Sequence, residues 1–345
     1  PYDLTKDILI EKGIDPDEKN FQKALEIQKN RSRLSKLEKV SDWIILKDIK
    51  SKGFLGHKIF NKKVKIIRYR EVENLKDKFF QIVLDCTPFY PESGGQVSDS
   101  GFLINKSSKT EIVNVKIENN LILHYVRELP VNISSEFEAV IDVQKRELVS
   151  KNHTATHILH NILRRIYGKT VEQKGSFLNE EYLRFDFSLN KKVINEELNK
   201  IETEVNEEIW RNHLVYEENQ VNINDAKKRG AIMLFGEKYS DKVRVISFSD
   251  SIELCGGSHV QRTSEIGLFK IIKETSVSAG VRRIEAITSK LAFNYLNQIE
   301  LSSRKLAEFV KEKDFNLAVD KTINKYLANQ KELLLVKSQL IEEKV

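Results

Sequence analysis

A change of residue pattern near residue 145 constrains the fold of this 345-residue chain more than any other feature. From about Ile44 to Val143 the sequence forms short runs of β-branched and aromatic residues, such as KFFQIVLD and EFEAVIDV, which turn signals separate. Several short strands at this spacing predict a small β-barrel or a sandwich. Beyond Lys145, helical and strand-like segments alternate. That mixture predicts helices packed on an antiparallel sheet.

The segments after this change can be assigned one by one. DVQKRELVSKNHTATHILHNILRRIYG predicts a helix that ends near Gly168, and NEELNKIETEVNEEIWRN predicts another. VEQKGSF and YLRFDFSL are typical of a hairpin, while VRVISFS, LFKIIKET and VRRIEAITS predict strands. Apolar residues recur at helical spacing from about Lys290 onward, with a break at Asp314, which predicts two helices packed as an antiparallel pair.

We therefore predict an α+β chain, and its length suits two or three folding units. The predicted parts are a helical segment at 1–40, a small β-barrel at 41–144, an antiparallel-sheet and helix core at 145–289, and a helical pair at 290–345. The last pair is a packing seam and a possible surface for self-association.

The charge balance and the cysteine content narrow the class of partner. The chain has 57 Lys and Arg against 51 Asp and Glu, a net charge of +6, which modestly favours nucleic acid. Cys86 and Cys255 lie far apart, so a disulfide framework is not expected and a reducing, cytoplasmic location is. No apolar run approaches the ~18–20 residues that span a bilayer, so we expect no membrane partner. Because the sequence begins at Pro1, we expect it to be a piece of a longer protein.

Two short motifs carry residues that bind metal ions. His153 and His157 are four residues apart on a predicted helix, so both imidazoles share one face. His160 follows one turn later, and a surface role for these histidines is an equal alternative at this point. Cys255 and His259 flank two glycines and a serine, and a tight loop of this kind brings both side chains to one point. Together the two half-sites supply four ligands that suit zinc.

Four protein ligands would complete a tetrahedral shell, which is typical of structural zinc, whereas catalytic zinc keeps an open position. The role of the metal therefore stays open. The loop TPFYPESGGQ at 87–96 is a third feature, and its Pro and Gly residues predict a turn between strands. Gly94 and Gly95 allow backbone to approach a ligand closely.

Several segments, in order, resemble the editing region shared by alanyl-tRNA synthetases and free-standing alanyl-tRNA editing proteins. They are TPFYPESGGQVSDSG at 87–101, NHTATHILHNIL at 152–163, QKGSF with YLRFDFS at 173–188, LFGEKY at 234–239, ELCGGSH at 253–259 and AGVRRIEAIT at 279–288. The family's loop usually has Thr where Ser258 stands here. Residues 1–33 resemble the stretch before the editing region of the synthetase, which favours a synthetase fragment.

The resemblance implies one zinc ion per chain, held by His153, His157, Cys255 and His259. It implies that Thr156 and Gln173 line a catalytic pocket. We expect further substrate contacts from a set of glycine-loop and basic residues, namely Gly94, Gly95, Gln96, Lys174, Arg282 and Arg283.

We therefore predict an editing fragment that hydrolyses tRNA(Ala) mischarged with serine or glycine. The aminoacylation core, with its ATP and magnesium, would lie upstream and be absent. Alternatives are a free-standing editing protein, a non-catalytic zinc-stapled tRNA-binding module, or a metallohydrolase for a small molecule. The last lacks an HExxH motif.

Overall fold

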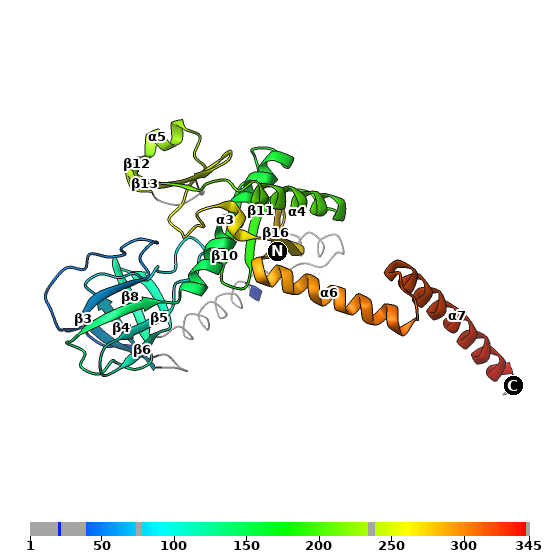
Figure 1. Cartoon of the computed structure of the whole chain (residues 1–345), viewed down its shortest axis with the longest axis horizontal. Coiled ribbons are helices and arrows are strands. Elements are labelled where there is room, and N and C mark those ends of the chain that lie inside the picture. The colour runs from blue at the N-terminus through cyan, green and yellow to red at the C-terminus, as the bar shows by residue number, and fades with distance from the viewer. Residues whose placement is uncertain (1–19, 22–38, 74–77, 234–238, 343–345) are drawn as a thin grey trace. The chain divides into compact units, whose positions relative to one another are not determined.

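The computed structural model describes residues 20–21, 39–73, 78–233 and 239–342 (Figure 1). The chain divides into two compact units, Pro1–Thr288 and Ser289–Val345, which we treat separately. The helical segment predicted at 1–40 falls outside the described residues, apart from Asn20, Phe21 and the two-residue strand β1. The finer division into four parts stays a prediction.

Nine strands form an antiparallel sheet in the first part of the larger unit (Figure 1). They are β1 (Lys39–Val40), β2 (Ile44–Ile45), β3 (Asn61–Glu73), β4 (Lys78–Leu84), β5 (Gly101–Ile104), β6 (Lys109–Ile112), β7 (Asn114–Glu118), β8 (Leu121–Val126) and β9 (Glu136–Ile141). Alternation is clearest in β9, where Phe137, Ala139 and Ile141 are buried. These side chains join a core that includes Leu84, Leu103 and other residues of the sheet.

The strand order does not by itself show the predicted small barrel, so closure of this sheet stays a prediction. The path of the sheet is β6-β5-β9-β3-β4-β8-β7, with β1 and β2 also paired to β3. Among the described residues no pairing joins the end strands β6 and β7. The two end strands are separated in sequence only by Val113, whose amide donates to the Tyr125 carbonyl at 2.9 Å. The long strand β3 pairs with β9 over Asn61–Lys65 and with β4 from Ile66 to Glu73, with an irregular register between Ile66 and Arg68. The strand pattern in the sequence predicted the strands but contained no information on whether the edges meet.

Helix α3 (Val143–Tyr167) follows the sheet directly and confirms the predicted helix. The Asp142 side chain caps its first turn by accepting a hydrogen bond from the Lys145 amide at 3.0 Å. Gly168 ends the helix with φ 98°, a conformation that favours glycine. The middle of α3 is buried almost all round, from Asn152 to His160. It therefore runs through the interior of the unit.

A four-stranded antiparallel sheet packs against α3 and α4 (Asn195–Trp210), as the α+β pattern predicted. Its order is β10 (Gln173–Leu178), β11 (Leu183–Ser188), β16 (Val281–Thr288) and β15 (Phe269–Ser278). The predicted hairpin is the β10–β11 pair. Phe185 and Phe187 of β11 pack with Leu159 of α3 and Ile201 of α4 in the largest core of the chain.

A three-stranded sheet completes the larger unit. It consists of β12 (Tyr216–Asn222), β13 (Lys242–Phe248) and β14 (Ser251–Leu254), with α5 (Ile223–Lys228) beside it and the short 3-10 helix η1 (Thr263–Ile266) following. Val243, Val245 and Leu254 form its small core with Ala226. Most of the LFGEKY segment lies outside the described residues.

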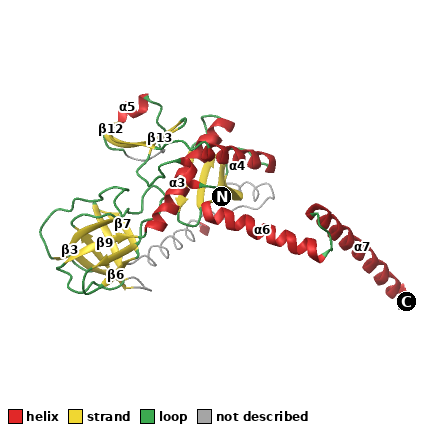
Figure 2. Cartoon of the chain, in the orientation of Figure 1, coloured by secondary structure: helices red, strands yellow, loops and turns green. Residues whose placement is uncertain are grey.

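The smaller unit contains α6 (Ser289–Phe309) and α7 (Phe315–Glu342), and Figure 2 shows only helices and their connection there. Two helices separated near Asp314 were predicted. Their packing as an antiparallel pair and any self-association stay predictions. Within the part of the chain that the structure describes, no helix is long and apolar enough to cross a membrane.

Candidate metal centre

His153 and His157 lie one turn apart on the buried stretch of α3. Each is 6% exposed, and their ring centroids are 5.1 Å apart. The i,i+4 spacing on a regular helix places both rings on the same side. Because both rings are removed from solvent, the alternative of two surface histidines is excluded. His160, the third histidine of the motif, is also buried, at 2% exposure.

Cys255 and His259 lie on the loop that leaves β14. Arg244 of β13 holds this loop, since its Nη1 donates to the carbonyl oxygens of Cys255 at 2.9 Å and Gly257 at 2.6 Å. Gly257 comes so close to α3 that a Cβ atom there would lie 2.0 Å from Cε1 of His153. A glycine at this position is therefore required for the loop to pack on the helix.

The four predicted ligands converge, as the two half-sites indicated. Their ligand atoms all lie within 4.8 Å of one another. Cys255 Sγ is 3.3 Å from Nε2 of His153 and 3.3 Å from Nε2 of His259. Bonds of ~2.0–2.3 Å at a tetrahedral angle separate zinc ligands by about 3.5 Å. The donor set and its spacing thus fit a tetrahedral metal ion of the zinc type.

Hydrogen bonds at Nδ1 fix the orientation of two of the three imidazoles. Gln96 Oε1 is 2.7 Å from Nδ1 of His153 and also accepts from the Ser258 amide, so it identifies Nδ1 as the protonated nitrogen. Thr154 Oγ1 gives its proton to the Ser150 carbonyl, so it accepts from Nδ1 of His259 at 3.1 Å. In both rings Nε2 is left for a metal.

Burial makes these imidazoles neutral, which is the form that binds metals. It holds the pKa of His153 and His259 well below the ordinary value, and the neighbouring histidines lower both further. The pKa of His157 is also lowered by burial, against the opposing effect of Glu253. Burial alone would raise the pKa of Glu253, but the imidazoles of His157 and His160 and the Ser251 hydroxyl bring it to about 2.

A small cavity of about 90 Å³ is lined by three of the four candidate ligands, His153, His157 and Cys255. Thr156, Gln173 and Gly94, three of the predicted site residues, line it together with Tyr90 and Ser176. The Thr156 hydroxyl donates to the Asn152 carbonyl at 2.8 Å, and Gln173 Nε2 donates to Ser176 Oγ at 3.2 Å. The structure thus brings these residues to the metal centre, while their chemical roles stay predictions.

The other predicted substrate contacts lie elsewhere or serve the fold. Gln96 is 1% exposed and bonds to His153 and Ser258, as described above. Gly95 packs directly against Ser176, since a Cβ atom added at Gly95 would lie 2.4 Å from Oγ of Ser176. The three cations on β10 and β16 each form an ion pair, Lys174 with Glu172, Arg282 with Glu274 and Arg283 with Asp186. Their proposed contacts with substrate stay predictions.

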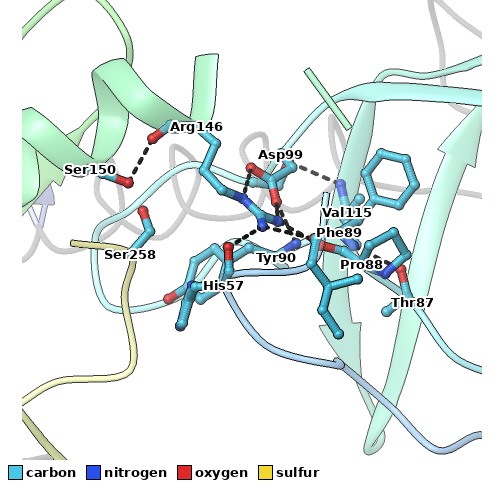
Figure 3. A network of polar contacts seen from close by, with 12 residues as sticks. His57, Thr87, Pro88, Phe89, Tyr90, Asp99, Val115, Arg146, Ser150 and Ser258 are labelled. Carbon is cyan, nitrogen blue, oxygen red and sulfur yellow. Dashed lines mark hydrogen bonds and ion pairs between the residues drawn. The ribbon is translucent and has the colours of Figure 1, made fainter. Parts of the chain in front are cut away.

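Arg146, which the sequence patterns did not single out, joins α3 to the nine-stranded sheet (Figure 3). This arginine is 3% exposed. It forms an ion pair with the buried Asp99 and donates to the carbonyl oxygens of Pro88 at 2.6 Å and His57 at 2.9 Å. Asp99 in turn accepts from the Tyr90 amide at 2.6 Å. The loop of residues 87–101 is thereby fixed to the helix that carries two metal ligands.

A second cavity of about 540 Å³ lies behind the ligand loop and was not foreseen either. Ser258 and His259 line it, together with His57, Arg146 and Arg244. Burial, followed by the charges of Arg244 and Arg146, lowers the pKa of His57 to about 3.

Two family models match parts of this chain. Residues 1–145 match the family of tRNA synthetases class II (A), and residues 243–285 match the threonyl and alanyl tRNA synthetase second additional domain. The second match contains Cys255 and His259, and the first contains Gln96.

Curated relatives carry one name, alanine–tRNA ligase. The protein of Christiangramia forsetii is 47% identical over 300 residues, which cover 86% of this chain and 34% of the relative. The protein of Flavobacterium psychrophilum is 44% identical over 364 residues, which cover 99% of this chain and 41% of the relative. The protein of Porphyromonas gingivalis is 41% identical over 355 residues, which cover 100% of this chain and 40% of the relative. The chain therefore spans about two fifths or less of the length of these relatives.

These findings correct two predictions. The prediction of a fragment without the class II aminoacylation part is overturned, because the class II (A) model matches residues 1–145. The predicted editing function is overturned with it. The comparisons support the class II part of an alanine–tRNA ligase with its second additional domain, and they give no support to hydrolysis of mischarged tRNA. They establish similarity to aminoacyl-tRNA synthetases, which are enzymes of translation.

Proposed function

We propose that this chain is a segment of an alanine–tRNA ligase, the enzyme that joins alanine to tRNA(Ala), and that it binds the tRNA around a zinc centre. The observation that carries the proposal is the similarity to alanine–tRNA ligases over 86% to 100% of the chain. It includes a class II synthetase match and a second additional domain match in order.

The reaction of such a ligase has two steps. The alanine carboxylate attacks the α-phosphate of ATP and releases pyrophosphate, and a hydroxyl of the terminal ribose of the tRNA then takes the alanyl group and releases AMP. The complete ligase would use ATP, with magnesium, in the first of these steps. Binding of tRNA(Ala) by this segment is supported by the net charge of +6.

Zinc, held by His153, His157, Cys255 and His259, would supply a rigid tetrahedral centre. Four protein ligands leave no open position, which favours a structural role. This centre would fix the loop of the second additional domain to α3. Gln96, from the part that matches class II synthetases, bonds to both sides. Its side chain would keep the two matched regions in one arrangement while tRNA binds.

The test is attachment of radiolabelled alanine to tRNA(Ala) by the complete ligase that contains this segment, with ATP and magnesium. We expect charging by the unaltered protein and a loss of bound zinc, with weaker tRNA(Ala) binding, in Cys255→Ser. A complete protein that fails to charge tRNA(Ala) with alanine would refute the proposal. An unaltered protein that charges tRNA(Ala) but contains no zinc would refute only the metal centre.

A further inference from the structure

Glu253 is a buried carboxylate that faces the outer side of a metal ligand. It lies on β14, two residues before Cys255, and is 5% exposed. Its Oε2 is 3.5 Å from Nδ1 of His157, and its Oε1 is 3.5 Å from Nδ1 of His160. The Ser251 hydroxyl donates to Oε1 at 3.3 Å. The carboxylate is therefore held from two sides and directed at His157.

His157 is the one histidine of the cluster whose orientation Gln96 and Thr154 do not fix. Its ring lies 4.7 Å from that of His259 and 5.1 Å from that of His153, so it closes the cluster on the third side. With Nδ1 toward Glu253, the nitrogen left for a metal is Nε2, as in the other two rings. Nδ1 of His157 makes no hydrogen bond in this structure, and Glu253 is the carboxylate that lies beside it, at 3.5 Å.

The charge of Glu253 also requires a partner. A carboxylate removed from water is costly unless a cation or several hydrogen bonds compensate for it. The polar groups that face Glu253 include two imidazoles and one hydroxyl. A divalent ion bound by one thiolate and three neutral imidazoles keeps one positive charge. Glu253, on the far side of His157, supplies the matching negative charge.

We propose that Glu253 is the positioning residue of the metal centre, which accepts a hydrogen bond from Nδ1 of His157 when the ion is bound, directs Nε2 to the ion and balances the ion's remaining charge. The inference rests on the zinc centre of the proposed function. It assigns to Glu253 a role beyond that of the four ligands. Outer partners of this kind change metal affinity about 10–100-fold when they are removed.

Glu208 offers a matched control in the same chain. It is also 5% exposed, and its Oε2 is 3.1 Å from Nε2 of His213. It lies on α4, away from the four ligands, and pairs with Arg165 and Arg211. Replacement of Glu208 removes a buried carboxylate from a histidine without touching the metal centre.

The experiment measures zinc affinity by competition with a chromophoric chelator, using the chain with Glu253→Gln, Ser251→Ala and Glu208→Gln. Glutamine has the shape of glutamate but no charge. We expect affinity to fall about 10–100-fold in Glu253→Gln and about 2–10-fold in Ser251→Ala, and to stay unchanged in Glu208→Gln. The visible spectrum of Co²⁺ in place of zinc should change in Glu253→Gln, because His157 turns, and stay the same in the control.

The outcomes separate the hypotheses. Equal zinc affinity in Glu253→Gln and the unaltered chain overturns the role of Glu253 and leaves the metal centre intact. Equal losses in Glu253→Gln and Glu208→Gln overturn it as well, because a general loss of stability would then explain both. If the Glu253→Gln protein does not fold, equal zinc affinity in Ser251→Ala and in the unaltered chain overturns the role of Glu253. Failure of the unaltered chain to bind zinc overturns the metal centre itself.

Discussion

Gly257 is the position where a single methyl group tests the packing of the ligand loop on α3. In Gly257→Ala the new Cβ would lie 2.0 Å from Cε1 and 2.3 Å from Nδ1 of His153, and 2.6 Å from Oε1 of Gln96. Carbon contacts below 3.0 Å do not occur in folded proteins, so the imidazole or the loop must move by about 1 Å. Zinc–ligand distances tolerate only about 0.2 Å. We therefore expect Gly257→Ala to lose His153 as a ligand and most of its bound zinc.

The expected cost to stability comes from the same overlap. Overpacking of a close-packed interior costs about 1–3 kcal/mol. For a unit of this size each kcal/mol lowers the melting temperature by about 2–4 °C. Loss of zinc adds to this, because a metal that binds only the folded state stabilises it. Zinc content by elemental analysis and the melting temperature with and without a chelator measure both effects.

The neighbouring Gly256 supplies the control, since a Cβ added there meets nothing within 4 Å. Neither glycine has a positive φ, so backbone strain does not distinguish them. Gly256→Ala should keep its zinc and its melting temperature. Full zinc occupancy in Gly257→Ala, or equal losses in both variants, would show that the close approach to His153 does not govern metal binding.

Three further predictions concern the fold and the partner. Arg146→Met leaves Asp99 buried without its cation, which should lower the free energy of unfolding by about 3–5 kcal/mol in urea titrations; an unchanged value would contradict the role of this pair. Burial lowers the pKa of His124 to about 4, so its neutral form stabilises the fold above the unfolded pKa of about 6.5, and this contribution disappears as the pH falls toward 4. Between pH 7 and pH 5 the loss is about 2 kcal/mol, and His124→Gln should remove that part of the slope. Binding to tRNA(Ala) should weaken steeply with salt in filter-binding assays, and salt-insensitive binding would argue against phosphate contacts.

The elements of the fold were predictable where the local pattern was strong. The α3 helix, with its Gly168 stop, and the β10–β11 hairpin are present where the sequence predicted them. Whether this sheet closes was not predictable, because closure depends on how distant edge strands pair, and strands of an open sheet and of a barrel have the same alternation. The division of β3 between two partners is a long-range property of this kind.

The convergence of the four candidate ligands was predictable because their residue types and spacings are restrictive. His153 and Cys255 are 102 positions apart, yet each belongs to a short motif that is informative alone. Gln96 and Glu253 lie within segments that carried the resemblance, but nothing in the local sequence showed that Gln96 bonds to His153 or that Glu253 lies beside His157. Arg146 was the hardest to foresee, because a buried arginine has the same sequence signature as an exposed one on an amphipathic helix.

The error about function has a related cause. The segments around the candidate site resemble the editing region of alanyl-tRNA synthetases, and the function was predicted from that resemblance. Residues 1–145, which match class II synthetases, include the nine-stranded sheet. Two buried contacts join the loop of residues 87–101 in this part to α3 and to the ligand loop. Arg146 fixes α3 to Asp99, and Gln96 reaches both His153 and Ser258. Because both contacts are buried and polar, separation of the sheet from the metal centre would leave unpaired charges and amides on each side. The candidate metal centre is therefore part of one continuous structure with the region that matches class II synthetases, and its function should be measured in a protein that contains both.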